Sequence, residues 1–294
     1  MKQFILKIAL FFAVTLFMML LLDLAYTKVY QTSSPRTKIQ YLRTLKDQKI
    51  DYIFIGSSRV ESGIVPSIIE KKTGKTALNL GFQAAKLHDI YTILQLVQHY
   101  KIKHERIFIQ VDYSYNINQA STIFQPEIIP FMHENEIYDN HLKFDSIHYN
   151  QYRYIPFFRY GRNDLKLGFR EIGLNLAKKK TNAVTYKGYA PLYGNAEKHH
   201  FPLPDKINES NEYIKHIQEF CEKNKIKITF YTAPFCQHTT NLDFIAQLKT
   251  KIPGLYDFSR TVKDENLFQN ANHLNDKGAQ YFTEIFADEV LTNK

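Results

Sequence analysis

The sequence predicts an α/β protein with a three-layer α/β/α architecture around a doubly wound parallel sheet. An N-terminal transmembrane helix precedes this domain, and a large insertion interrupts it. Three observations support the prediction. Short, nearly continuous apolar runs are typical of strands covered on both faces. Segments with helical periodicity alternate with those runs, which favours parallel crossover units. The first apolar run is long enough to cross a bilayer.

Residues 4–26 form the predicted anchor, assigned to residues 1–26. At ~1.5 Å per residue this segment is about 34 Å long, which is enough to span a membrane. The following "DLAYTKVYQ" lacks a small-x-small cleavage site, which favours an uncleaved anchor over the alternative, a cleaved signal peptide. Basic residues lie on both sides, so the positive-inside rule does not decide the orientation. A short basic start followed by an apolar run favours an exported body.

Residues 27–50 are predicted to hold a juxtamembrane linker (27–35) and a helix from Ser34–Pro35 to about Lys46, with Ser34 as N-cap. The main domain is assigned to residues 51–294. Its predicted elements follow in chain order: strand 51–56, helix 65–74, strand 76–82, helix 85–100, strand 106–114, helix 208–224, strand 227–234, helix 240–250, strand 254–259 and helix 276–291 with Asn275 as N-cap.

The helix–strand alternation lapses from about residue 115 to residue 205, where Tyr, Asn, His and Lys are frequent and periodicity is broken. So long an irregular segment inside one domain is typical of a functional insertion or lid. Its aromatic cluster at 149–160 is compatible with packing onto the sheet, stacking on sugar rings or contact with lipid headgroups.

Composition narrows the function classes. The chain has 294 residues, 44% of them hydrophobic, and a formal net charge of +9. Its lysines are scattered and no zinc-finger or RNA-binding signature accompanies them, so a solvated basic surface is favoured and no nucleic-acid partner is expected. Cys221 and Cys236 are not a CxxC pair, and a disulfide and two buried thiols both remain open. The adjacent histidines of "EKHHF" do not share one face, so no metal site is predicted.

The stretch "FIGSSRVESG" (54–63) takes a buried strand directly into a serine-containing turn. Open α/β sheets place their chemistry at the carboxyl ends of strands. His273 precedes the last helix, in a loop that reaches the same edge of such a sheet. A serine hydroxyl needs an adjacent base to become a useful nucleophile. The sequence therefore predicts that Ser58 and His273 lie within hydrogen-bond reach.

"GSSRV" after the first strand, Gly81 after the second and "NxxHLNxxGA" near the C-terminus resemble the SGNH/GDSL hydrolase superfamily. The resemblance covers roughly residues 50–112 and 206–292. More narrowly, the chain looks like the membrane-anchored branch similar to alginate O-acetylation and DltD-type proteins. The resemblance implies that Ser58 is the nucleophile, that His273 is the base and that Asn270 occupies the acid position. It also implies that the backbone N–H groups of Gly81 and Ser58 donate to an oxyanion.

The sequence departs from the family pattern at two positions. Asn270 replaces the usual aspartate, and an amide carbonyl can orient the imidazole but stabilises its charge less. Asp257 or Asp264 are candidates to substitute for the missing acid. The asparagine of the third family block has no clear match; Asp112 stands nearby, and a carboxylate accepts hydrogen bonds instead of donating them. For Arg59, binding of an anionic substrate and pairing with a carboxylate both remain open.

The resemblance implies an extracytoplasmic, serine-dependent O-acyl transferase or esterase that acts, most simply with acetyl groups, on a cell-envelope polysaccharide. It implies a single-pass protein of the bacterial cytoplasmic membrane with its soluble domain in the periplasm, and no cofactor. A cell-surface glycan, an acyl donor and a membrane-bound O-acyltransferase are the expected partners. The alternative is a non-catalytic accessory or glycan-binding partner of that acyltransferase, with Asn270 marking lost catalysis.

Overall fold

A central parallel sheet organises the computed structural model, which describes residues 1–196 and 199–292. Its strand order within these residues is β2-β1-β3-β5-β7. Because the chain moves first to one side of β1 and then to the other, the sheet is doubly wound, as predicted. The strands are β1 (Tyr52–Gly56), β2 (Ala77–Gly81), β3 (Arg106–Gln110), β5 (Ile228–Thr232) and β7 (Tyr256–Asp257).

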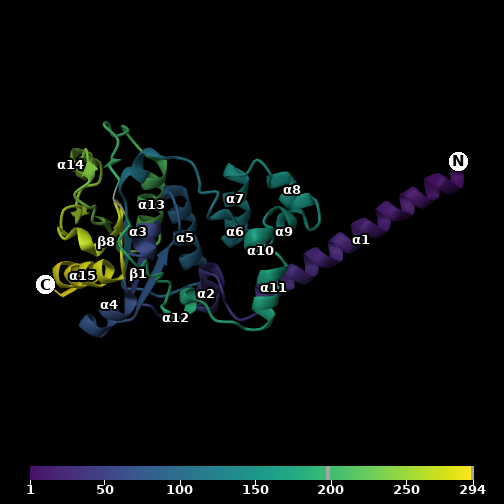
Figure 1. Ribbon diagram of the computed structural model, residues 1–294, viewed down its shortest axis with the longest axis horizontal. Coiled ribbons are helices and arrows are strands. Elements are labelled where there is room, and N and C mark those ends of the chain that lie inside the picture. Colours follow the sequence, from purple (N-terminus) through teal and green to yellow (C-terminus); the bar gives the residue numbers. More distant parts are fainter. Residues whose placement is uncertain (197–198, 293–294) are drawn as a thin grey trace.

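Helices cover both faces of this sheet (Figure 1). Alternate side chains of β1 point to opposite faces, so Ile53 and Ile55 join one core while Tyr52 and Phe54 join another. The first core contains residues of α5 and α13, and the second contains residues of α4 and α15. The three-layer α/β/α prediction is confirmed. These helices span Pro66–Thr73 (α4), Leu87–His99 (α5), Glu212–Lys223 (α13) and Asp276–Phe286 (α15), while α14 (Asp243–Lys251) joins the first core.

The segment between β3 and α13 consists largely of short helices. Each has at most 10 residues, which is shorter than the window over which helical periodicity can be recognised. One of them, α7, packs against α5 of the main domain. The elements are η1 (Tyr113–Asn116), α6 (Gln125–Ile128), η2 (Ile129–Phe131), α7 (Glu136–Asp145), α8 (Tyr149–Tyr154), α9 (Phe158–Arg162), α10 (Asp164–Leu167), α11 (Phe169–Leu176), α12 (Asn182–Thr185) and the two-residue strand β4 (Phe201–Pro202).

The N-terminal helix α1 (Lys2–Thr32) is long and apolar enough to cross a membrane, and it projects from the body as a single rod (Figure 1). It extends beyond the predicted anchor, so the prediction of a linker at 27–35 is wrong for residues 27–32, which are helical. The reason is tertiary packing: Tyr30 is buried and stacks on Tyr160, and the Thr27 hydroxyl lies 2.7 Å from the Tyr160 hydroxyl. The next helix, α2 (Lys38–Thr44), is capped by Thr37 instead of the predicted Ser34.

A small hairpin prepares the functional site. It pairs β8 (Phe268–Asn270) with β9 (His273–Leu274) and places Asn270 opposite His273. The 3-10 turn η3 (Glu265–Leu267) leads into it, and α15 follows it with Asn275 as N-cap, as predicted. A second short pair joins β4 to β6 (Thr239–Thr240), and the last turn after α15 is η4 (Ala287–Thr292). The two cysteines are buried, free thiols.

Candidate active site

Ser58 is the first residue of the short helix α3 (Ser58–Glu61), directly after β1. Ser57 is the N-cap, and its hydroxyl accepts from the Arg59 N–H. Gly56 makes this tight turn possible, because a Cβ there would lie 2.4 Å from a Val60 methyl group. The sequence thus brings the serine hydroxyl to the carboxyl edge of the sheet, between β1 and β3, where the winding changes direction.

His273 meets Ser58 at this edge. The Ser58 Oγ and the His273 Nε2 are 2.7 Å apart, although the residues are 215 positions apart in the chain. The contact is partly buried. The structure therefore brings together the hydroxyl and the imidazole that the sequence analysis selected.

Asn270 fixes the imidazole from the other side. Its Oδ1 lies 3.0 Å from His273 Nδ1 and accepts from the backbone N–H groups of Asn272 and His273, at 3.1 and 3.0 Å. A flipped amide would set its NH₂ group against these two donors, so the carbonyl oxygen must face the ring. His273 Nδ1 is then the protonated nitrogen, and the Nε2 lone pair faces the Ser58 hydroxyl. The asparagine thus holds the tautomer that a serine nucleophile requires.

Neither candidate for a substitute acid reaches the imidazole. Asp257 Oδ1 accepts from the Thr232 hydroxyl and the Ser259 N–H, at 3.2 and 3.0 Å. Asp264 Oδ1 accepts from the Asn266 N–H at 2.9 Å and caps a 3-10 turn. Both carboxylates accept hydrogen bonds from groups other than the imidazole, so the suggestion that one of them replaces the acid is wrong.

The imidazole is held in its neutral form. Burial, and to a smaller extent the Arg59 charge, lower the pKa of His273 to about 4, while the Asp112 charge opposes this shift. At neutral pH the ring can therefore accept a proton from the serine.

Gly81 does not present its N–H to the site. That group donates to Asn79 Oδ1 at 2.9 Å, which corrects the predicted role of Gly81 as an oxyanion donor. Its lack of a side chain serves packing instead, since a Cβ there would lie 2.2 Å from the Glu61 nitrogen of α3. The Ser58 N–H, in contrast, has no protein partner within residues 1–196 and 199–292 and remains available to an oxyanion.

Arg59 is buried beneath the site. Its Nη1 donates to Asp112 Oδ2 at 2.6 Å, its Nη2 to the carbonyls of Ala233 and Pro234 at 2.8 and 2.6 Å, and its Nε to the Asn272 carbonyl at 3.1 Å. Of the two alternatives for Arg59, the structure thus has carboxylate pairing, and the guanidinium is not open to a substrate. It joins the carboxyl ends of β1, β3 and β5 to the loop that carries the imidazole.

Two buried amides that sequence reasoning missed complete this scaffold. Gln110 Oε1 accepts from the Ser57 N–H and hydroxyl, at 3.1 and 2.8 Å, and its Nε2 donates to Asp112. Asn79 donates to the Val60 carbonyl at 2.7 Å and so ties α3 to β2. Their signal in the sequence was a polar residue inside the apolar strand "ALNLG" and at the carboxyl end of "RIFIQ".

One buried group in the described part of the chain has metal-ligand composition. The ligand atoms of His88, Asp89 and His141 lie within 4.8 Å of one another. The two imidazoles stack at 4.5 Å with an angle of 11° between their planes. Lone pairs that lie in nearly parallel ring planes do not converge on one ion, and burial lowers the pKa of both rings. The group is therefore best described as neutral histidines that pack α7 onto α5.

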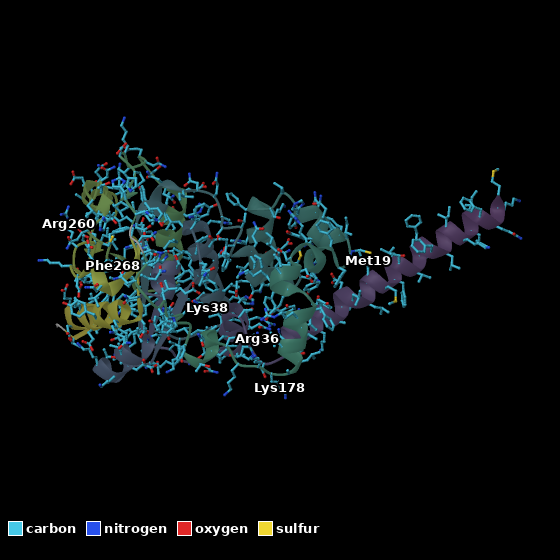
Figure 2. The ribbon with its side chains drawn as sticks, in the orientation of Figure 1. Met19, Arg36, Lys38, Lys178, Arg260 and Phe268 are labelled. Atoms are coloured by element: carbon cyan, nitrogen blue, oxygen red, sulfur yellow. The ribbon has the colours of Figure 1, made fainter. Side chains whose placement is uncertain are left out.

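Two hollows flank the loop of His273. One, of about 380 Å³, is lined by Tyr186, Tyr189, Tyr193 and Asp276 among others, and the Tyr189 hydroxyl donates to Asp276. The other, of about 610 Å³, is lined by Phe235 and Arg260 among others, and Figure 2 shows Arg260 at the end of the body away from α1. The first is bordered by Asp276, which lies three positions after His273 in the chain.

No family model matches the chain, and neither does any curated protein. Several solved structures are similar to it, among them the following two. One is provisionally assigned as a platelet activating factor from Streptococcus pneumoniae, with a TM-score of 0.40, 11% identity, and coverage of 85% of this chain and 90% of that chain. The other is provisionally assigned as a lipolytic protein of the G-D-S-L family from Desulfitobacterium hafniense DCB-2, with a TM-score of 0.29, 13% identity, and coverage of 82% and 98%. At these TM-scores the matches carry no argument about activity.

Proposed function

We propose that this chain is a serine-dependent esterase or O-acyl transferase of the SGNH type. Ser58 is the nucleophile, His273 is the base, and Asn270 positions the ring. The observation that carries the proposal is the 2.7 Å contact between Ser58 Oγ and His273 Nε2, in an imidazole whose tautomer is set by Asn270.

The reaction follows from this geometry. The Ser58 proton passes to His273 Nε2 while Oγ attacks the acyl carbonyl, and the developing oxyanion receives the Ser58 N–H. The carbon–oxygen bond to the leaving alcohol breaks, and that alcohol takes the proton from Nε2. Water or a sugar hydroxyl then gives its proton to Nε2 and attacks the acyl-enzyme, which releases an acid or a newly acylated sugar and restores Ser58.

The proposed substrate is an acylated polysaccharide of the cell envelope, and acetyl is the simplest acyl group. The proposed partner is a membrane-bound O-acyltransferase that supplies the acyl group. The tyrosine-lined hollow beside Asp276 supports a sugar ligand, because aromatic rings stack on sugar faces and a carboxylate binds hydroxyl groups.

The proposed location is a membrane, with α1 retained as the anchor and the soluble domain in the periplasm. Packing of α1 supports retention. Tyr30 belongs to the main core, and Asp23 forms a 2.6 Å ion pair with the buried Arg159. Cleavage near Tyr26 would remove Asp23 and leave that guanidinium without its carboxylate, which is costly for a buried charge.

A fluorophosphonate probe tests the nucleophile. Because it phosphonylates activated serine hydroxyls, we expect mass spectrometry to find the adduct on Ser58 in the wild type, and strongly reduced labelling in His273→Ala. Absence of the adduct, under conditions in which a known serine esterase is fully labelled, would contradict the proposal.

The pH dependence of ester hydrolysis should reflect the buried imidazole. Since the base must be neutral, kcat/KM is expected to rise as pH increases through about 4 and to stay level through neutral pH. A pH–rate profile of the full chain in detergent measures this. An inflection near the ordinary histidine value would show that the ring is far more solvated than the structure describes.

Asn270→Asp should move that inflection to higher pH. A carboxylate would stabilise the imidazolium, while it could still accept the two backbone N–H groups that Asn270 accepts. In a serine triad in which asparagine imposes the wrong tautomer, replacing aspartate by asparagine lowers kcat by roughly 10⁴. Here the tautomer is already correct, so we expect Asn270→Asp to raise kcat by only about tenfold. An unchanged inflection would argue against contact between residue 270 and the ring.

A further inference from the structure

The end of α1 is fixed to the helical segment that follows β3. Asp23 pairs with Arg159 at 2.6 Å and accepts the Phe157 N–H at 2.9 Å. The side chains of Arg159 and Asp23 are 3% and 14% exposed, so this ion pair is largely removed from water. Tyr26 packs edge-on against Phe157. The position of Asp23 relative to α9 is therefore set by buried contacts, with no linker between them.

These contacts determine which part of the body lies at the level of the membrane surface. The apolar part of α1 runs from Phe4 to Leu22 with Lys7 as its one charged residue, and its 19 residues span about 28 Å at ~1.5 Å per residue. This length matches a hydrocarbon core of about 30 Å, so Asp23 falls at its boundary. Figure 2 shows this part of α1 projecting from the body, and its side chains are exposed except that of Met19, which is half-buried beside the body. Because α9 holds Asp23, α9 lies at the headgroup level.

Around α9, large apolar side chains point into solvent. Leu165 is 97% exposed, Ile147 89%, Phe169 79% and Tyr154 71%. They come from α8, α10, α11 and the turn before α8, and these helices surround the end of the body from which α1 projects (Figure 1). Single exposed apolar residues are ordinary, but a group of them beside a membrane span marks an interaction surface.

Cations accompany these apolar side chains. Arg162, Lys166 and Arg170 are exposed, and they are interrupted by one exposed acid, Asp164. Arg170 lies 3.6 Å from Glu171, a carboxylate that Arg36 also binds. Such a combination is typical of segments that lie in the membrane interface. Their apolar side chains insert between lipids, and their basic side chains pair with anionic headgroups.

We infer that residues 147–170 form a membrane-docking face that lies in the headgroup region of an anionic lipid bilayer. The inference rests on α1 spanning that bilayer and is independent of the proposed chemistry at Ser58. The helical segment after β3 then acts as a platform: α1 and the docking face hold the protein at the membrane at separate points. The candidate site keeps one orientation above the membrane instead of swinging on a tether.

Fluorescence quenching on the full chain tests this inference. The protein is reconstituted in vesicles of phosphatidylcholine with about one third phosphatidylglycerol, which supplies the anionic charge. Leu165→Cys and Tyr154→Cys are labelled with an environment-sensitive dye. These positions are exposed, so folding should be preserved, and the native cysteines are buried. Tyr281→Cys is the matched control, since Tyr281 is 48% exposed on α15, at the other end of the body (Figure 1).

Labels at 154 and 165 should be quenched several-fold more by spin-labelled lipid than the label at 281, and several-fold less by aqueous iodide. Equal quenching at all three positions would overturn the inference. Labels shielded from iodide but untouched by lipid quencher would also overturn it, because a protein interface would then cover the face. Lys166→Glu with Arg162→Glu should reduce lipid quenching at 165, whereas Lys215→Glu with Lys223→Glu on α13 should leave it unchanged.

Discussion

Ser58→Ala and His273→Ala are each expected to reduce turnover of p-nitrophenyl acetate by roughly 10⁴–10⁶-fold, and the double variant should be no slower than either single variant. The two groups act as one unit: the hydroxyl is a weak nucleophile without the imidazole, and the imidazole has no proton to accept without the hydroxyl. The measurement is kcat/KM of the full chain in detergent, with the unfolding midpoint recorded for each variant.

Two exposed residues that contact neither Ser58 nor His273 supply matched controls. Ser210 precedes α13 and His216 lies on it. The variants Ser210→Ala and His216→Ala should both retain wild-type turnover. If wild-type turnover is no faster than that of the Ser58 and His273 variants, the chain is not an esterase toward this ester. Such a result, together with an unlabelled Ser58, would favour the accessory or glycan-binding role.

The sheet could be predicted from the sequence because its signals are local. Buried parallel strands need apolar side chains on both faces, and the runs around Ile53, Leu78 and Ile107 satisfy this requirement at regular intervals. The approach of Ser58 to His273 also followed from topology, since the loops after parallel strands meet at one edge.

The remaining features depend on tertiary contacts that no local pattern encodes. Thr27 to Thr32 stay helical because Tyr30 finds a buried place against Tyr160, not because of their own propensity. The Gly81 N–H was assigned to the oxyanion from the family pattern, but the Asn79 side chain two residues earlier accepts it. To predict a hydrogen bond of this kind, one must know the direction of the side chain, which the sequence does not supply.

Arg59→Met is expected to lower the free energy of unfolding by about 3–5 kcal/mol, because it leaves Asp112 as a buried charge without its counter-ion. The side chains of Arg59 and Asp112 are each 2% exposed and lie 2.6 Å apart. Urea unfolding of the full chain in detergent measures the loss. Lys215→Ala removes an exposed pair with Glu219, whose members are 75% and 59% exposed, and should change stability by less than about 0.5 kcal/mol.

A second substitution separates the charge effect from simple loss of packing. Asp112→Asn in the Arg59→Met background removes the unpaired charge, so the double variant should recover part of the lost stability. If it does not, the guanidinium stabilises the fold mainly through its hydrogen bonds to the Ala233, Pro234 and Asn272 carbonyls. The pH–rate profile adds a readout that a purely structural role would not move. Because the Arg59 charge lowers the pKa of His273, the single variant should shift the acid inflection upward. A folded Arg59→Met protein with an unshifted inflection would show that Arg59 does not act on the imidazole electrostatically.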